Sequence, residues 1–118
     1  MWYHLFNMPT LNVFYRHDRH EPQLEAVTDP LKLYVAEQLT CGDITLNSDE
    51  VSVRLLKSIG SGMLADVEMD MTAAAYAERV ERQDEICLNV RAFAMEKMPE
   101  VGDVKVWLNL HELGHSWE

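Results

Sequence analysis

The chain has 118 residues, of which 47% are hydrophobic and 25% are charged, and its formal net charge is −10 at pH 7. This size and composition predict one globular domain whose core needs neither disulfides nor a structural metal. The acidic charge argues against a nucleic-acid-binding protein, because phosphate binding needs clustered Lys and Arg, and only 10 such residues are spread along the chain. No apolar run is long enough to span a membrane, and residues 1–7 lack the basic start and cleavage site of a signal peptide, so we expect a cytoplasmic protein without membrane contact.

The first predicted strand begins at Pro9. Leu11, Val13 and Tyr15 alternate with polar residues, a pattern typical of a strand with one buried face, and only Phe14 interrupts it. Proline is tolerated at the first residue of a strand because its missing N–H removes no ladder hydrogen bond there. The segment before Pro9 is rich in aromatic side chains, so we expect it to pack against the domain.

A helix is predicted to begin at Pro30. Thr28-Asp29-Pro30 combines capping residues with proline at the first helical position, whereas Glu21-Pro22 predicts a turn. Apolar residues then recur at three- and four-residue steps, and Gly42 is a candidate stop. His17 and His20 fall in the polar turn before this helix and are interpreted as ordinary surface histidines.

Two more strands are predicted in the middle of the chain. Residues 51–56 alternate apolar and polar side chains, and so do residues 66–71. Between them, residues 58–62 contain two glycines and predict a flexible joint between two halves of the chain.

The longest predicted helix spans Ala73–Met98 and ends before Pro99. Its apolar stripe includes Val80. A fourth strand is predicted over residues 104–110, with Trp107 on the face opposite the aliphatic side chains.

This order of elements predicts an α+β fold of two tandem β-α-β units, with a four-stranded mixed sheet and two helices on one face. We assign residues 1–118 to one domain, made of an N-terminal extension (1–8), two halves (9–58 and 63–110) and a tail (111–118). Two helices cover only one face of such a sheet. Since Trp107 and its neighbours are not polar enough for water, we expect self-association over the other face.

The C-terminal string His111-Glu112-Leu113-Gly114-His115 matches the zinc-binding motif H-E-x-x-H. That motif needs a helix to present both rings on one face, but here it follows an alternating strand and contains Gly114. We expect no third ligand downstream, since three residues follow His115. A C-terminal turn with ordinary surface histidines is therefore the preferred interpretation, and a zinc hydrolase is a remote alternative.

The two cysteines are interpreted as structural. Cys41 and Cys87 lie in apolar patterns without close spacing, so we expect buried free thiols rather than a disulfide. We expect neither a bound metal nor a cofactor.

Pro9, Arg16, Arg19 and Arg54 form the candidate catalytic set. A proline at a free N-terminus is a secondary amine, and an apolar pocket with cationic neighbours would lower its pKa toward neutrality, so that it could act as a general base. It would remove a proton alpha to a carbonyl while arginines hold the substrate carboxylate and the developing enolate oxygen. In the chain as numbered, the Pro9 nitrogen is an amide without a proton, so this chemistry requires synthesis from Met8 and removal of that Met. Otherwise Pro9 only starts a strand, and the arginines are solvated at strand ends.

These residues resemble the tautomerase superfamily, the group that contains oxalocrotonate tautomerase and macrophage migration inhibitory factor. Met8-Pro9-Thr10-Leu11 is similar to the family's start, Arg19 to the arginine after the first strand of its shorter members, and Ser52-Val53-Arg54 to their second-strand arginine. The resemblance implies a catalytic base at Pro9, substrate-binding arginines and a homotrimer whose sheets form an inner barrel. The 7 residues before Pro9 depart from the family pattern and point to an uncharacterised branch.

Two functions remain open on the sequence. The first is an isomerase of small carboxylate-bearing keto acids, with Pro9 as base and Arg16, Arg19 and Arg54 as binding residues. The second is a non-catalytic, oligomeric binding protein on the same scaffold, in which the extension blocks Pro9 and the arginines hold a small anionic metabolite. The environment of the Pro9 nitrogen separates the two.

Overall fold

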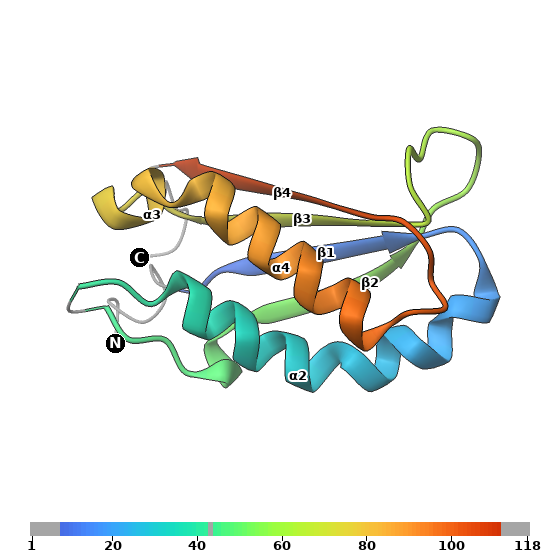
Figure 1. Ribbon diagram of the computed structural model, residues 1–118, viewed down its shortest axis with the longest axis horizontal. Coiled ribbons are helices and arrows are strands. Elements are labelled where there is room, and N and C mark those ends of the chain that lie inside the picture. Colours follow the sequence, from blue (N-terminus) through green and yellow to red (C-terminus); the bar gives the residue numbers. More distant parts are fainter. Residues whose placement is uncertain (1–7, 43, 112–118) are drawn as a thin grey trace, which may run out of the picture.

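The computed structural model describes residues 8–42 and 44–111. The strands are β1 (Thr10–Tyr15), β2 (Ser52–Lys57), β3 (Val67–Ala74) and β4 (Val104–His111). The helices are α2 (Glu21–Leu39), α3 (Ala77–Glu81) and α4 (Gln83–Lys97), and two short 3₁₀ turns, η1 (Asp18–His20) and η2 (Ser48–Glu50), precede α2 and β2. Figure 1 shows the course of the chain through these elements.

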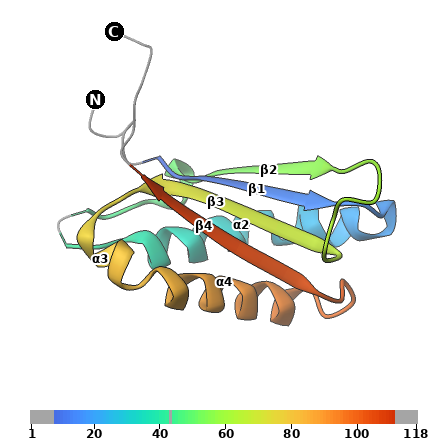
Figure 2. The ribbon, with the colours of Figure 1, turned by 90° about the horizontal axis from the view of Figure 1, so that it is seen from above.

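The strands form one 4-stranded sheet in the order β2-β1-β3-β4. β1 is parallel to β2, and β3 is parallel to β4, so α2 and the α3–α4 segment are each a crossover between parallel strands. The two halves meet where β1 pairs antiparallel with β3. Figure 2 shows α2 and α4 together on one side of the sheet. The predicted fold, two β-α-β units with a mixed sheet and helices on one face, is therefore confirmed.

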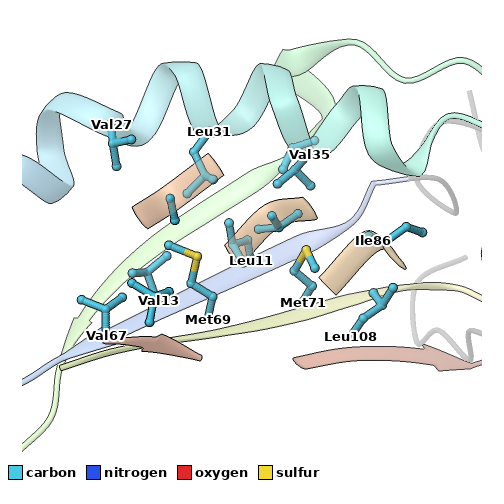
Figure 3. Close-up of a cluster of buried hydrophobic side chains, with 14 of the residues drawn as sticks. Leu11, Val13, Val27, Leu31, Val35, Val67, Met69, Met71, Ile86 and Leu108 are labelled. Carbon is cyan, nitrogen blue, oxygen red and sulfur yellow. The ribbon is translucent and has the colours of Figure 1, made fainter. Parts of the chain in front are cut away.

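The core lies between the sheet and the two long helices. The predicted alternation in the first and third strands is confirmed, since Leu11 and Val13 of β1 and Met69 and Met71 of β3 are all 0% exposed. These side chains point toward the helices and pack against them, as Figure 3 shows. The helix residues of this core include Leu24, Val27, Leu31, Val35 and Leu39 of α2, and Ile86, Val90 and Ala94 of α4.

The predicted start of the first helix is wrong. α2 begins at Glu21, with Pro22 in its first turn, where a backbone N–H is not needed for the helix. Pro30, the predicted first helical residue, lies inside the helix. Pro30 and Ala26 are both exposed, so water can reach the carbonyl that Pro30 leaves unbonded. Burial of Val27 and Leu31 on the opposite side keeps the helix continuous across this position.

The second helix is also shorter than predicted. Ala73 belongs to β3 and pairs with Leu110 of β4, and the helical region is divided at Arg82. Because α3 is a separate turn, its inward face differs from that of one continuous helix. Val80, predicted to be buried, is 51% exposed, and Arg79 is buried instead.

The sheet face opposite the helices is not covered by any described part of the chain (Figure 2). We call it the uncovered face. It carries Thr10, Asn12 and Phe14 of β1, Ser52, Arg54 and Leu56 of β2, Glu68, Asp70 and Thr72 of β3, and Lys105, Trp107 and Asn109 of β4. Trp107 is 43% exposed there and Leu56 is 37% exposed. The face therefore mixes exposed aromatic and aliphatic side chains with charged ones.

Several predictions fall outside the described residues. They are the packing of residues 1–7 and the conformation of residues 112–115 of the H-E-x-x-H string. None of the helices described is long and apolar enough to cross a membrane.

Candidate active site

Pro9 lies directly before β1, at the end of the sheet where β3 finishes. Its side chain is buried, and its carbonyl accepts a hydrogen bond of 3.0 Å from the Ser52 N–H at the start of β2. The next residue, Thr10, is opposite Ser52 on one side and Thr72 on the other. This pairing holds Pro9 between two neighbouring strands. Its nitrogen is acylated by Met8 in this chain, so it has neither a proton nor basicity.

Of the three predicted arginines, Arg54 lies on β2, the strand that pairs with β1. It is exposed on the uncovered face, opposite Asn12 in the register of β1 and β2. Asn12 follows Pro9 by three residues, which corresponds to about 10 Å along a strand. The Asn12 Oδ1 atom is buried without a hydrogen-bond partner in the described structure. Pro9, in contrast, is buried like Leu11 on the helix side.

Arg16 and Arg19 lie at the other end of β1. Six strand residues separate them from Pro9, a rise of about 20 Å. Arg16 faces Asp66, with 3.9 Å between Nη2 and Oδ1, and its Nε is buried without a partner. Arg19 is exposed in η1. One chain therefore does not bring these two arginines to Pro9, and a shared site would need Arg16 and Arg19 from another copy.

The surroundings of Arg16 and Arg19 are strongly charged. Lys57 Nζ lies 2.5 Å from Asp18 Oδ1, and this pairing lowers the pKa of Asp18 and raises that of Lys57. The Tyr15 hydroxyl donates a 2.7 Å hydrogen bond to Glu21, which raises the pKa of Tyr15 to about 12. Arg16 and Lys57 thus already lie close to carboxylates, whereas Arg19 has no ion pair among the described residues.

His20, expected at the surface, is 2% exposed. It lies in the connection between β1 and α2, and the centre of its ring is 5.8 Å from that of His17 in an edge-to-face arrangement. Neither ring nitrogen has a hydrogen-bond partner in the described structure, and burial lowers the pKa of His20. His20 is therefore held neutral and is a packing residue.

Arg79 is the residue that sequence analysis missed. It is 1% exposed and lies at the same end of the sheet as Pro9, since its Nη1 donates to the Ala74 carbonyl at the end of β3 (3.1 Å). Its Nε donates to the Leu39 carbonyl at the end of α2 (2.9 Å). In the sequence, Arg79 is simply one arginine within an amphipathic stretch, and nothing there marks it as buried. The division of this stretch at Arg82 is what turns the Arg79 side chain toward the interior.

The uncovered face has a hollow of about 240 Å³, lined by Phe14, Glu68, Asp70, Trp107 and Asn109. Asp70 accepts a 2.6 Å hydrogen bond from Asn109, and Glu68 accepts the Leu64 and Ala65 N–H groups. Two carboxylates would repel a carboxylate-bearing substrate. This hollow therefore does not suit the anionic ligand that the arginines predict.

Of the H-E-x-x-H string, the structure describes His111, which is the last residue of β4 and not part of a helix. Within residues 8–42 and 44–111, no group of three or more His, Cys, Asp or Glu side chains could hold a metal ion.

Comparison with solved structures identifies the fold. A macrophage migration inhibitory factor-like protein from Entamoeba histolytica superposes with a TM-score of 0.61 at 16% identity, covering 94% of each chain. A 5-carboxymethyl-2-hydroxymuconate isomerase from Deinococcus radiodurans has a TM-score of 0.58 at 15% identity, over 96% of this chain and 90% of that one. The chain has the tautomerase fold.

A third tautomerase-fold structure, a fused 4-OT described as an asymmetric trimer, has a TM-score of 0.55 at 17% identity and covers 92% of this chain and 94% of that one. No protein-family model matches the sequence, and no curated protein matches it. The predicted resemblance to the tautomerase superfamily is therefore confirmed at the level of the fold.

Proposed function

We propose that this tautomerase-fold protein is a keto–enol isomerase of small carboxylate-bearing keto acids, with Pro9 as its general base. The observation that carries the proposal is the position of Pro9. It directly precedes the first strand of a tautomerase fold, where its side chain is buried and its carbonyl accepts the hydrogen bond from Ser52. Two solved structures with this fold are named as 5-carboxymethyl-2-hydroxymuconate isomerases.

The proposed reaction requires Pro9 as a free N-terminus. Its secondary amine would then remove a proton alpha to the substrate carbonyl, and burial would disfavour the charged ammonium form that cannot act as a base. A guanidinium would stabilise the enolate oxygen by a charge-assisted hydrogen bond, and another would hold the carboxylate. None of these steps needs a cofactor.

The proposed substrate-binding residues are Arg54 within one chain and Arg16 and Arg19 from a neighbouring copy. This division follows from the rise of about 20 Å along β1 between Pro9 and the latter two. A homotrimer with the uncovered faces turned inward would supply such a neighbour. The fused 4-OT described as a trimer supports this arrangement. We propose a cytoplasmic location for the assembly.

The test is an enzyme assay on a chain that begins at Pro9. We expect this chain to ketonise the enol of phenylpyruvate and Pro9→Ala to lower kcat by about 10²- to 10⁴-fold, the usual contribution of a general base. The chain beginning at Met1 should be inactive, because its Pro9 nitrogen is an amide. An unchanged rate in Pro9→Ala would refute the proposed base.

A second assay compares Arg54 with an arginine outside the proposed site. Arg54→Ala should lower kcat/KM by about a hundredfold if Arg54 binds charge that develops in the transition state. Arg82 is the matched control, because it pairs with Glu85 (2.5 Å) on α4 and lies outside the proposed site. Arg82→Gln should leave kcat/KM within about twofold, a change of under 1 kcal/mol in activation energy. Equal losses in both variants would contradict a specific role for Arg54.

The alternative is a non-catalytic, oligomeric protein that binds a small anionic metabolite. One observation favours it: the Pro9 nitrogen is an amide in this chain, while Arg19 and Arg54 are exposed and free to bind an anion. Mass spectrometry of the protein made from its native gene decides between the two. A chain that begins at Pro9 supports the isomerase, and a chain that retains Met1 supports the binding protein.

A further inference from the structure

A groove lies between α2 and α4, the two helices that cover one side of the sheet (Figure 2). It consists of two hollows, of about 230 Å³ and about 180 Å³, which share Pro30 and Lys97. We call the two together the helix groove. The larger hollow is also lined by Leu33, Tyr34, Glu37 and Phe93, and the smaller by Gln23, Ala26 and Val27. Assembly through the uncovered face would leave this groove open, because it lies on the opposite side of the sheet.

The larger hollow has an aromatic wall. Tyr34 of α2 and Phe93 of α4 stack on each other, with 4.2 Å between the ring centres and 11° between the ring planes. Both rings are half-buried and pack against the core, so the wall is held in place. Leu33 beside them is 55% exposed. This apolar surface suits a flat ring, which gains contact area against aromatic neighbours.

The smaller hollow contains hydrogen-bond acceptors that the helix leaves unused. Pro30 has no N–H, so the carbonyl of Ala26, four residues earlier in α2, lacks its helical hydrogen bond. Ala26 and Pro30 are both exposed, and a ligand can reach this carbonyl. Gln23 Nε2 donates to Glu100 Oε2 at 2.6 Å, and Gln23 Oε1 is buried without a partner in the described structure. The wall of this hollow is therefore rich in acceptors.

Lys97 supplies a donor to both hollows. Its Nζ lies 5.6 Å from the centre of the Phe93 ring, and it forms no ion pair with any residue that the structure describes. An anionic ligand group would meet the carboxylate of Glu37 and the unused acceptors, whereas a cationic group would meet Lys97. An uncharged group that both donates and accepts suits this mixture. A hydroxyl does both on a single atom.

We propose that the helix groove binds a small uncharged phenol. The ring lies against the wall formed by Tyr34 and Phe93, and the hydroxyl donates to the Ala26 carbonyl and accepts from Lys97 Nζ. A phenol carries its hydroxyl directly on a flat ring, and with a pKa of about 10 it keeps its proton at neutral pH. The site is separate from Pro9 and from the proposed arginines, so it does not depend on the isomerase reaction.

The test measures the binding of p-cresol to the full chain by ¹H–¹⁵N NMR titration and compares it with 4-methylanisole, which keeps the ring and the oxygen but lacks the hydroxyl proton. We expect p-cresol to shift the resonances of residues that line the helix groove. 4-Methylanisole should bind at least about tenfold more weakly, because it leaves the Ala26 carbonyl unpaired in a covered site. Equal affinities, an absence of shifts, or shifts confined to another surface would overturn the proposal.

Pro30→Ala tests the contact with the Ala26 carbonyl. This variant supplies the missing N–H to that carbonyl, so the preference for p-cresol over 4-methylanisole should fall about fivefold. Loss of the proline ring alone would weaken both compounds equally and leave the preference unchanged. No core side chain is altered, and urea denaturation checks that the variant is folded. An unchanged preference would contradict the proposed hydrogen bond.

Lys97→Met tests the donor, since it keeps the apolar stem and removes the ammonium group. We expect it to weaken the binding of p-cresol by about three- to tenfold, the effect of one lost hydrogen bond. Lys32→Met is the matched control, because Lys32 lies on α2 but lines neither hollow, and it should leave the affinity within about twofold. Equal losses in the two lysine variants would argue against a specific contact with Lys97.

Discussion

At the scale of single residues, two polar side chains lie in the interior of the described structure. His20 is 2% exposed at one end of β1, and Arg79 is 1% exposed at the other. They differ in how their polar atoms are satisfied. Arg79 donates to the Leu39 carbonyl at the end of α2 and to the Ala74 carbonyl at the end of β3, and so links these two elements. His20 has no hydrogen bond in the described structure and is buried only in its neutral form.

His20 makes the stability of the protein dependent on pH. Burial lowers the pKa of His20 below its ordinary value of 6.5, and the neighbouring Arg19 and His17 act in the same direction, while Asp66 opposes them. As the pH falls below about 6.5, the unfolded chain binds a proton that the folded chain excludes. The free energy of unfolding should therefore fall as the pH is lowered, and it should be fully retained above this value.

The measurement is urea denaturation between about pH 7 and about pH 5, the range in which an unfolded histidine titrates. His20→Leu should reduce the pH dependence of the unfolding free energy over this range, because no buried group then titrates. His17 is the matched control, because it is the exposed neighbour of His20. A slope that is the same in His20→Leu as in the unmodified protein would refute this account.

At the scale of elements, the boundaries of the helices were predicted less well than their existence. α2 continues through Pro30 because the opposite side of the helix is buried over several turns. The sequence Thr28-Asp29-Pro30 is a strong local signal for the start of a helix. In the structure, however, Thr28 lies inside the helix, and its Oγ1 hydroxyl donates a 2.9 Å hydrogen bond to the Leu24 carbonyl. Tertiary packing thus overrides the local signal.

Pro30 is therefore a site where stability can be gained. Pro30→Ala supplies the missing N–H to the Ala26 carbonyl and should raise the free energy of unfolding by about 1–2 kcal/mol, the helix-interior cost of proline less its effect on the unfolded chain. Thermal or urea denaturation measures the change. Pro22→Ala is the control in the same helix, and it should have a smaller effect because Pro22 lies in the first turn. A loss of stability in Pro30→Ala would contradict this interpretation.

The turn before β4 depends on Gly102. Its φ is +93°, and a Cβ there would lie 2.5 Å from Asp66 Oδ2, which accepts the Asp103 N–H at 3.0 Å. Gly102→Ala should therefore lower the free energy of unfolding by about 1–3 kcal/mol, the usual range for a strained backbone position. Gly62 is the control, since its φ is not in the left-handed region and a Cβ would meet nothing within 4 Å. Equal effects at both positions in urea denaturation would contradict the argument.

At the scale of the whole molecule, the arrangement of the sheet separates the predicted site residues. Parallel pairing of β1 with β2 places Arg54 three residues along from Pro9, while Arg16 and Arg19 follow the far end of β1. The same arrangement leaves one face of the sheet without helices (Figure 2). The proposed homotrimer would account for both features, because a second copy would cover this face and would bring its own Arg16 and Arg19 to the Pro9 end of the sheet.

Self-association can be tested on the uncovered face. We expect the protein to sediment as an oligomer and Trp107→Lys to shift it toward the monomer, because a charge would replace an aromatic side chain at the proposed contact. Leu33→Lys is the matched control, since Leu33 is 55% exposed on α2, on the helix side of the molecule. Analytical ultracentrifugation gives the mass of each species. A monomeric unmodified protein, or equal shifts in both variants, would argue against assembly through this face.

Local patterns were sufficient to predict the order of the main elements and the buried side of the strands, since Leu11, Val13, Met69 and Met71 show their periodicity in any short window of the chain. The tautomerase fold was implied by the resemblance of short motifs such as Met8-Pro9-Thr10-Leu11 to that family. Tertiary packing, in contrast, places Pro30 within a helix, buries Arg79 against the ends of α2 and β3, and keeps Pro9 remote from Arg16 and Arg19. These features depend on contacts between segments far apart in the sequence, whose packing energy exceeds the local preference of any one residue.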